Sequence, residues 1–246
     1  MIMNSLFRRH VIRQGKGNES ARRMTSGGRW AEDSSARSQL TRSSGFVIAQ
    51  TAGFLIVCLT MVEMFVVPRN YFIAGSLVST SCMLCVALLL AKYGQLFHPS
   101  YRSIIIGVSS AVVLYLIFVG GNAAIKIVSP LGMSTTNESS IYALFASSPL
   151  QLKVLVFLLD AFGFESYFRG VLQRVVFAKL GVGSAFAVAA VDAAIHLSTL
   201  NPLFPVTTFI ADAVWGINYY FSKDVGSNIV SHFLWDMLVF VILPLS

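Results

Sequence analysis

Long apolar runs separated by short polar stretches make up the chain from residue 46 to its end. A run of about 20 apolar residues is long enough for a helix to cross a bilayer core of about 30 Å. We therefore predict an all-α fold, a polytopic transmembrane helical bundle with about seven membrane helices. The predicted helices cover residues 46–67, 71–91, 103–128, 150–180, 184–200, 204–221 and 228–245.

Prolines and polar residues mark the ends of several predicted helices. Pro68 ends the first, and Pro149 suits the first turn of the fourth. Residues 129–149 mix proline, glycine and polar side chains, so we predict a long loop there. Beyond Glu165 the fourth helix is too polar for an ordinary lipid-facing span, and we expect its second half to be amphipathic.

The composition supports a membrane protein. Hydrophobic residues make up 55% of the 246 positions, and only 12% are charged, whereas a soluble domain has about 25% charged residues. The mean hydropathy is +0.71. We therefore expect a multi-pass integral membrane protein whose principal surroundings are the lipid bilayer.

The first 45 residues differ from the rest because they are polar and basic. They hold nine of the 18 lysines and arginines. We predict a basic, disordered cytoplasmic tail over residues 1–45 and a transmembrane helical domain over residues 46–246. The tail's charge suits anionic lipid, and we expect no nucleic-acid partner. Its basic residues are Arg8, Arg9, Arg13, Lys16, Arg22, Arg23, Arg29, Arg37 and Arg42.

Three of the predicted helices each carry an ionisable pair spaced four residues apart. The pairs are Glu165 with Arg169, Asp192 with His196, and His232 with Asp236. Four residues is about one helical turn, so the members of a pair share a helix face. Ionisable groups in hydrocarbon are costly and normally face a bundle interior or a wet cavity. We therefore predict that the three pairs form one polar site.

The residue types of this site suit hydrolysis, because water attack needs a base for the water and donors for the oxyanion. A purely structural interpretation stays open for each pair. Glu165 and Arg169 would then be a structural ion pair, and His196 and His232 would be core histidines bonded to their aspartates. Asp160 and Asp212 also lie in apolar helices, where a carboxylate would either line the same cavity or cap a polar network, and we assign them no role.

The segment from Phe164 to Arg174, FESYFRGVLQR, resembles the first motif of the CAAX protease and bacteriocin-processing (CPBP, or Abi) family, Glu-Glu-x-x-x-Arg. His196 stands where the second motif has its histidine. The stretch from His232 to Asp236, HFLWD, looks like the third motif, His-x-x-x-Asn or Asp. The order and spacing of the motifs fit, and the resemblance covers a peptidase-like core at residues 147–245, similar to type 2 CAAX prenyl proteases.

The resemblance implies an intramembrane endopeptidase that hydrolyses a peptide bond near the C-terminus of a membrane-associated or prenylated peptide. In that family the first glutamate and the second-motif histidine hold and activate water. The third-motif histidine and its Asn or Asp stabilise the oxyanion. The implied catalytic set in this chain is Glu165, Arg169, Asp192, His196, His232 and Asp236.

The sequence departs from the family pattern at two positions. Phe164 replaces the first glutamate of the pair, which leaves only Glu165, and Asp192 replaces the aromatic residue of the second motif. One helical position is a rotation of about 100°, so Glu165 does not simply take over from residue 164. Our hypothesis is that Asp192 replaces the missing base or orients His196.

Phe164 also leaves open whether the chain is an enzyme, although we favour one. The alternative is a catalytically impaired pseudopeptidase that acts as a membrane binding or bacteriocin-immunity protein. A third interpretation, a small transporter with a proton path, is disfavoured because the chain shows no repeated halves.

The resemblance also raises a metal-dependent mechanism. Some accounts of the family place a metal on its motif residues, and a metalloendopeptidase of this kind binds a divalent metal such as zinc. Two histidines and a carboxylate would make a three-ligand site with an open position. The candidate ligands are Glu165, His196 and His232. The spacings alone do not require a metal, so a divalent metal such as zinc and a metal-free mechanism both stay open.

Overall fold

The computed structural model describes most of the chain beyond its N-terminal segment. Residues 1–43 of the predicted tail lie outside the described residues, so the tail and its cytoplasmic side stay predictions. The chain divides into two units, Met1–Ile48 and Ala49–Ser246, and the arrangement below is that of the second. The described residues are 44–66, 71–90, 100–128, 136–146 and 148–245.

The described part of the chain contains helices and no strand, which confirms the predicted all-α fold. A helix occupies each of the seven predicted ranges. The α-helices are α2 (Ser44–Val66), α3 (Phe72–Leu89), α4 (Tyr101–Val128), α5 (Thr136–Ala143), α6 (Leu150–Tyr167), α7 (Gly183–His196), α8 (Leu203–Ser222) and α9 (Val225–Met237). Two π-helical segments, Phe168–Val176 and Leu238–Ile242, continue α6 and α9, and 3₁₀ turns occupy Ala178–Leu180 and Leu197–Thr199.

Four of these helices are long and apolar enough to cross a membrane by length and composition. They are Ser44–Val66, Phe72–Leu89, Tyr101–Ala124 and Val225–Ile242. The apolar helix Gly183–Thr199 is shorter. The chain is thus an integral membrane protein with a helical bundle.

The prediction of a loop over residues 129–149 is wrong in part, because α5 forms within that range. Tertiary contacts hold this short helix in place. The Tyr142 ring packs at 5.7 Å from Phe240, and the Tyr142 hydroxyl accepts a hydrogen bond from the Leu245 backbone at 3.0 Å. Both partners lie about a hundred residues further along the chain, so local sequence did not reveal the helix.

Local sequence does explain where α6 and α9 begin. The Pro149 carbonyl accepts backbone hydrogen bonds from Leu152 and Lys153, so this proline opens α6 as predicted. Asp224 is the N-cap of α9, and its carboxylate accepts a hydrogen bond from the Gly226 backbone at 2.9 Å. These two starts begin the helices that carry Glu165 and His232.

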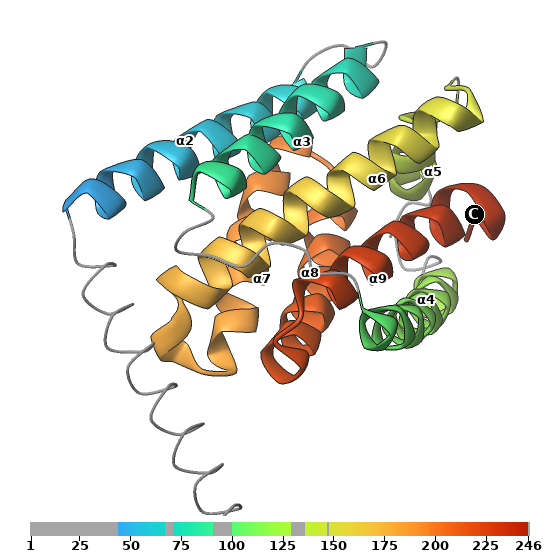
Figure 1. Cartoon of the computed structure of the whole chain (residues 1–246). Helices are drawn as coiled ribbons and strands as arrows, with labels where there is room; N and C mark the ends of the chain where they lie inside the picture. The colour runs from blue at the N-terminus through green and yellow to red at the C-terminus, as the bar shows by residue number, and fades with distance from the viewer. Residues whose placement is uncertain (1–43, 67–70, 91–99, 129–135, 147, 246) are drawn as a thin grey trace, which may run out of the picture. The chain divides into compact units, whose positions relative to one another are not determined.

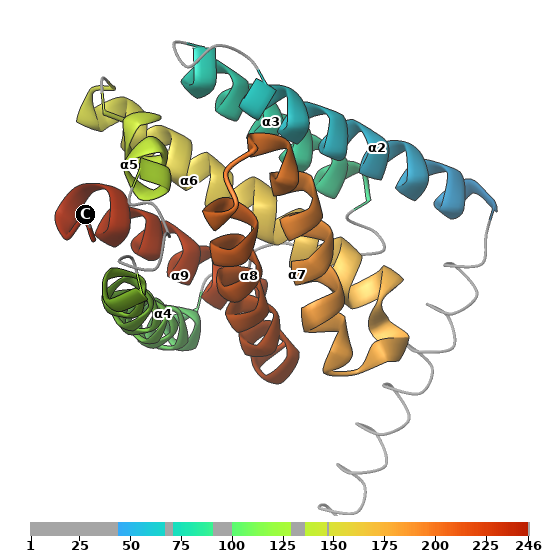
Figure 2. The ribbon, with the colours of Figure 1, turned by 180° about the vertical axis from the view of Figure 1, so that it is seen from behind.

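Contacts place α3, α6, α9 and α4 side by side in that order, and Figure 1 shows this row. Helices α7 and α8 pack on each other, and α8 also contacts α9 and α4. Seen from behind in Figure 2, α7 and α8 lie across the row. The α7–α8 pair is therefore joined to the row through α8.

The packing of α3 against α6 is close enough to require glycine at position 163. A Cβ atom there would lie 2.5 Å from the Thr80 carbonyl oxygen, which belongs to the backbone of α3. Small residues allow membrane helices to approach in this way. The contact fixes the rotation of α6 immediately before Phe164, and thus decides which side chains of α6 face the interior.

Candidate active site

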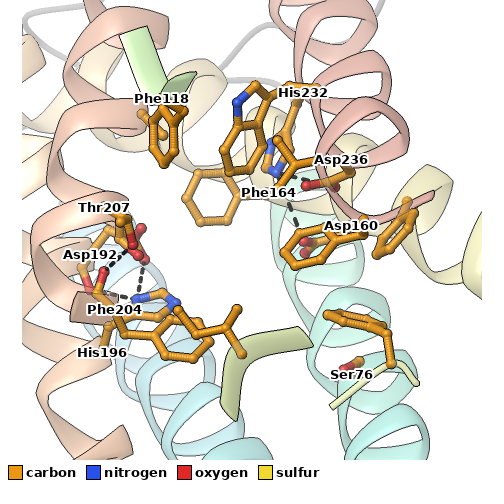
Figure 3. A pocket seen from close by; sticks show the side chains of 18 of the residues that line it. Ser76, Phe118, Asp160, Phe164, Asp192, His196, Phe204, Thr207, His232 and Asp236 are labelled. Carbon is orange, nitrogen blue, oxygen red and sulfur yellow. Dashed lines mark hydrogen bonds and ion pairs between the residues drawn. The ribbon is translucent and has the colours of Figure 1, made fainter. Parts of the chain in front are cut away.

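A cavity of about 290 Å³ lies among α3, α6, α7, α8 and α9 (Figure 3). Its lining is mostly apolar, with aromatic residues such as Phe164 and Trp215. The histidines and carboxylates that line it are Asp160, Asp192, His196, His232 and Asp236. In Figure 3 these residues form two groups on opposite sides, one around His232 and one around His196.

The first group consists of His232, Asp236 and Asp160. His232 Nε2 lies 3.7 Å from Asp236 Oδ2, one turn further along α9, and 3.9 Å from Asp160 Oδ2 on α6. The side chains of His232 and Asp236 are each 7% exposed, whereas that of Asp160 is 33% exposed. Asp160 thus presents the most accessible carboxylate of this group.

Glu165 fixes the imidazole of His232 from behind. Its Oε1 lies 2.9 Å from His232 Nδ1. Because a carboxylate accepts hydrogen bonds, Nδ1 carries the proton and donates, and Nε2 is left to face Asp160 and Asp236. Trp215 stacks on the imidazole at 4.0 Å, and the Phe164 ring meets it edge-on at 5.3 Å. Contacts with Glu165, Trp215 and Phe164 therefore fix the orientation of the His232 ring.

Glu165 itself lies behind the cavity wall, fully buried, in a network of donors. Its Oε2 accepts from Arg169 Nε at 3.1 Å and from Asn228 Nδ2 at 3.2 Å. Arg169 also pairs with Asp212 on α8, and both are buried. Buried charges require such pairing because they have lost water. Glu165 and Arg169 thus position the site without lining it.

The second group consists of His196 and Asp192 on α7. His196 Nδ1 lies 2.9 Å from the Asp192 backbone oxygen and 3.4 Å from Asp192 Oδ1. The carbonyl oxygen can only accept, so Nδ1 donates and Nε2 is the free nitrogen. The rings of Phe65 and Phe204 pack at 5.0 and 5.8 Å from the imidazole. Asp192 and these rings fix the orientation of His196.

The structure brings the members of all three predicted pairs into contact and joins two pairs directly. His232 links the Glu165 pair to the Asp236 pair, while the Asp192 pair shares the cavity from the other side. Sequence reasoning missed the role of Asn228, although it lies one turn before His232 on the same face. It noted Asp160 and Asp212 without a role, and a carboxylate inside an apolar helix was the available signal.

Among the described histidines, cysteines and carboxylates, one group of three places metal-type ligand atoms close together. Asp160, His232 and Asp236 each offer an atom within 4.8 Å of the others. The predicted ligand set of Glu165, His196 and His232 does not form such a group. Glu165 already accepts hydrogen bonds from three side chains, which leaves it poorly suited to a metal.

Comparison with known proteins identifies the segment that carries the site. The family model of the Rce1-like type II CAAX prenyl endopeptidases matches residues 146–238. No curated protein and no solved structure matches the chain. The matched segment runs from the start of α6 to the end of α9 and includes all three motifs. Residues 146–238 of this integral membrane protein are therefore similar to the Rce1-like type II CAAX prenyl endopeptidases.

Proposed function

We propose that this protein is an intramembrane endopeptidase that cleaves a membrane-associated or prenylated peptide near its C-terminus. One observation carries the proposal. Two histidines from different helices line one largely apolar cavity, and each is fixed through Nδ1, His232 by Glu165 and His196 by Asp192. Each imidazole then offers Nε2 for chemistry on a substrate.

The two histidines divide the work of hydrolysis. His232 Nε2, when protonated, donates a hydrogen bond to the oxygen of the scissile carbonyl as negative charge develops there. His196 Nε2 accepts a hydrogen bond from the attacking water and holds it on the other side of that carbonyl. Preorganisation is what makes these contacts effective, because neither ring has to reorient during the reaction.

The apolar lining supports a substrate with a hydrophobic or lipid-bearing end. Phe65, Phe72, Phe118, Phe157 and Phe240 surround the polar groups. A prenyl or other apolar chain buried among them would gain about 25 cal/mol for each Å² removed from water. The polar chemistry is then confined to the carboxylates and histidines of the two groups.

Asp160, His232 and Asp236 would also hold a divalent cation such as zinc. A bound cation of this kind polarises a carbonyl oxygen or activates water. The hydrogen bond from His232 Nδ1 to Glu165 is the support that metal-bound histidines normally have. The roles given to His196 and His232 above rest on the geometry of the chain's own residues.

Phe164 favours the alternative function, a pseudopeptidase that binds membrane peptides or serves in bacteriocin immunity. Its ring stacks on Phe168 at 4.1 Å and lines the cavity where the family motif has a glutamate. A protein of this second kind would bind the same apolar peptides and leave them intact.

The deciding experiment uses the full chain purified in detergent with fluorogenic prenylated and unprenylated peptides. Wild type is compared with His196→Ala, His232→Ala and Glu63→Gln, since Glu63 is exposed on α2 and does not line the cavity. We expect cleavage by wild type and Glu63→Gln and loss of cleavage in both histidine variants. Tight binding of the peptides by wild type without any cleavage would support the pseudopeptidase instead.

A further inference from the structure

We infer that Asp160 supplies the carboxylate that the motif lacks at position 164, and that it takes the proton from the attacking water. The inference rests on the proposed peptidase function. It departs from the hypothesis that Asp192 fills this role, and it assigns chemistry to a residue outside the three motifs.

The register of α6 is the first argument. Asp160 lies one turn before Phe164, so the two residues share a helix face, and both line the cavity. Side chains on a helix lean toward its N-terminus. A glutamate at 164 would therefore reach back over the turn that carries residue 160. Asp160 presents its carboxylate to the same cavity, one turn nearer the helix N-terminus.

The second argument is that two other carboxylates near the cavity are already paired behind its wall and that the rest are more deeply buried than Asp160. Glu165 accepts hydrogen bonds from Arg169, Asn228 and His232 behind the wall. Asp212 pairs with Arg169 and does not line the cavity. These two residues hold the helices in register, and neither presents an oxygen to a substrate.

Asp192 and Asp236 each serve a histidine on their own helix, one turn away. Asp160 approaches His232 from another helix, at 3.9 Å, and both this distance and the 3.7 Å to Asp236 are beyond hydrogen-bonding distance. Its side chain is 33% exposed, against 2% for Asp192 and 7% for Asp236. Within the described part of the chain, Asp160 is thus the cavity carboxylate with room to bind a water.

The reaction that follows is balanced without any further reactant. The attacking water donates one hydrogen bond to His196 Nε2 and the other to Asp160 Oδ2; it attacks the carbonyl carbon of the scissile amide and gives the second proton to Asp160. The carbonyl electron pair moves onto the oxygen, which faces His232 Nε2. The tetrahedral species then collapses, the C–N bond breaks, and Asp160 returns the proton to the leaving nitrogen. The products are a carboxylic acid and an amine.

The test moves the carboxylate from position 160 to position 164 in the full-length protein, purified in detergent. The variants are Asp160→Asn, Asp160→Ala, Phe164→Glu and the double change Asp160→Ala with Phe164→Glu, with Glu63→Gln as the matched carboxylate control. We expect Asp160→Asn and Asp160→Ala to lower kcat by about 100-fold or more, the usual size of a lost general base. Glu63→Gln should stay within about twofold of wild type. The double variant should recover at least about tenfold over Asp160→Ala.

Recovery in the double variant separates chemistry from structure, since a purely structural aspartate would not be replaced by a glutamate one turn away. Thermal unfolding in detergent checks that Asp160→Asn still folds. Cleavage by Asp160→Asn within about threefold of wild type, with His196→Ala inactive, would overturn the inference and leave the proposed function standing. The inference would also fall if wild type were inactive and Phe164→Glu active. Cleavage that survives both histidine changes would overturn the proposed function itself.

Discussion

Glu165 Oε1 lies 2.9 Å from His232 Nδ1, and this contact joins the first motif to the third from behind the cavity wall. The motif glutamate that this chain retains is therefore a positioning residue. Its two oxygens bind donors on α9 and on the π-helical segment that continues α6, which holds these helices together and aims His232 Nε2 at the cavity. The role of base then falls to a residue that faces the cavity.

Changing Glu165 should separate positioning from stability. Glu165→Gln keeps an oxygen for Arg169 or His232, so we expect a folded protein whose kcat falls by about 10- to 100-fold, as for other residues that orient a catalytic histidine. Glu165→Ala leaves buried Arg169 and His232 without this partner and should cost about 3–5 kcal/mol. Thermal unfolding and single-turnover cleavage measure the two effects. Equal activity in Glu165→Gln and wild type would contradict the positioning role.

Asp192 should matter less than Asp160. The backbone oxygen of Asp192 lies closer to His196 Nδ1 than its carboxylate does, 2.9 against 3.4 Å, and no substitution removes that backbone contact. We expect Asp192→Asn to lower kcat by about tenfold, because His196 keeps its main hydrogen bond. Steady-state cleavage of one peptide by Asp192→Asn and Asp160→Asn compares them directly. A larger loss of kcat in Asp192→Asn than in Asp160→Asn would assign the general base to Asp192 instead.

The contact at Gly163 gives a stability prediction with an internal control. Gly163→Ala places a Cβ 2.5 Å from the Thr80 backbone oxygen, so α3 and α6 must separate, and we expect a loss of about 1–3 kcal/mol. Gly120→Ala on α4 meets no atom within 4 Å and should stabilise its helix by about 0.5–1 kcal/mol. Thermal unfolding in the same detergent compares the two. A shift of both variants in the same direction would argue against the close α3–α6 contact.

Chelation tests whether the proton transfer assigned to Asp160 runs without a cation. With Asp160 acting directly on water, we expect wild type to keep its activity within about twofold after dialysis against a strong chelator. The metal content before and after dialysis is measured by elemental analysis. Loss of cleavage that added zinc restores would instead make Asp160, His232 and Asp236 a metal site, and the direct role of Asp160 would be wrong.

The sequence by itself determined the helices and the pairing within each helix. Apolar length located seven of them, and the four-residue spacing brought together Glu165 with Arg169, Asp192 with His196, and His232 with Asp236. Both signals are local, because they depend on the rise and rotation of a single helix. The motif order likewise indicated the family that the family model then matched.

Only the tertiary structure decided which side each helix turns to the cavity. The rotation of α6 depends on its contacts with α3 at Gly163 and with α9 at Glu165, and neither can be read from α6 alone. That rotation buries Glu165 and opens Asp160. The partners Asn228 and Asp212, and the short helix α5, likewise depend on residues far apart in the chain. Helix periodicity carries no information about such long-range packing, which is why the sequence named the site's motifs and left Asp160, which lines the cavity, without a role.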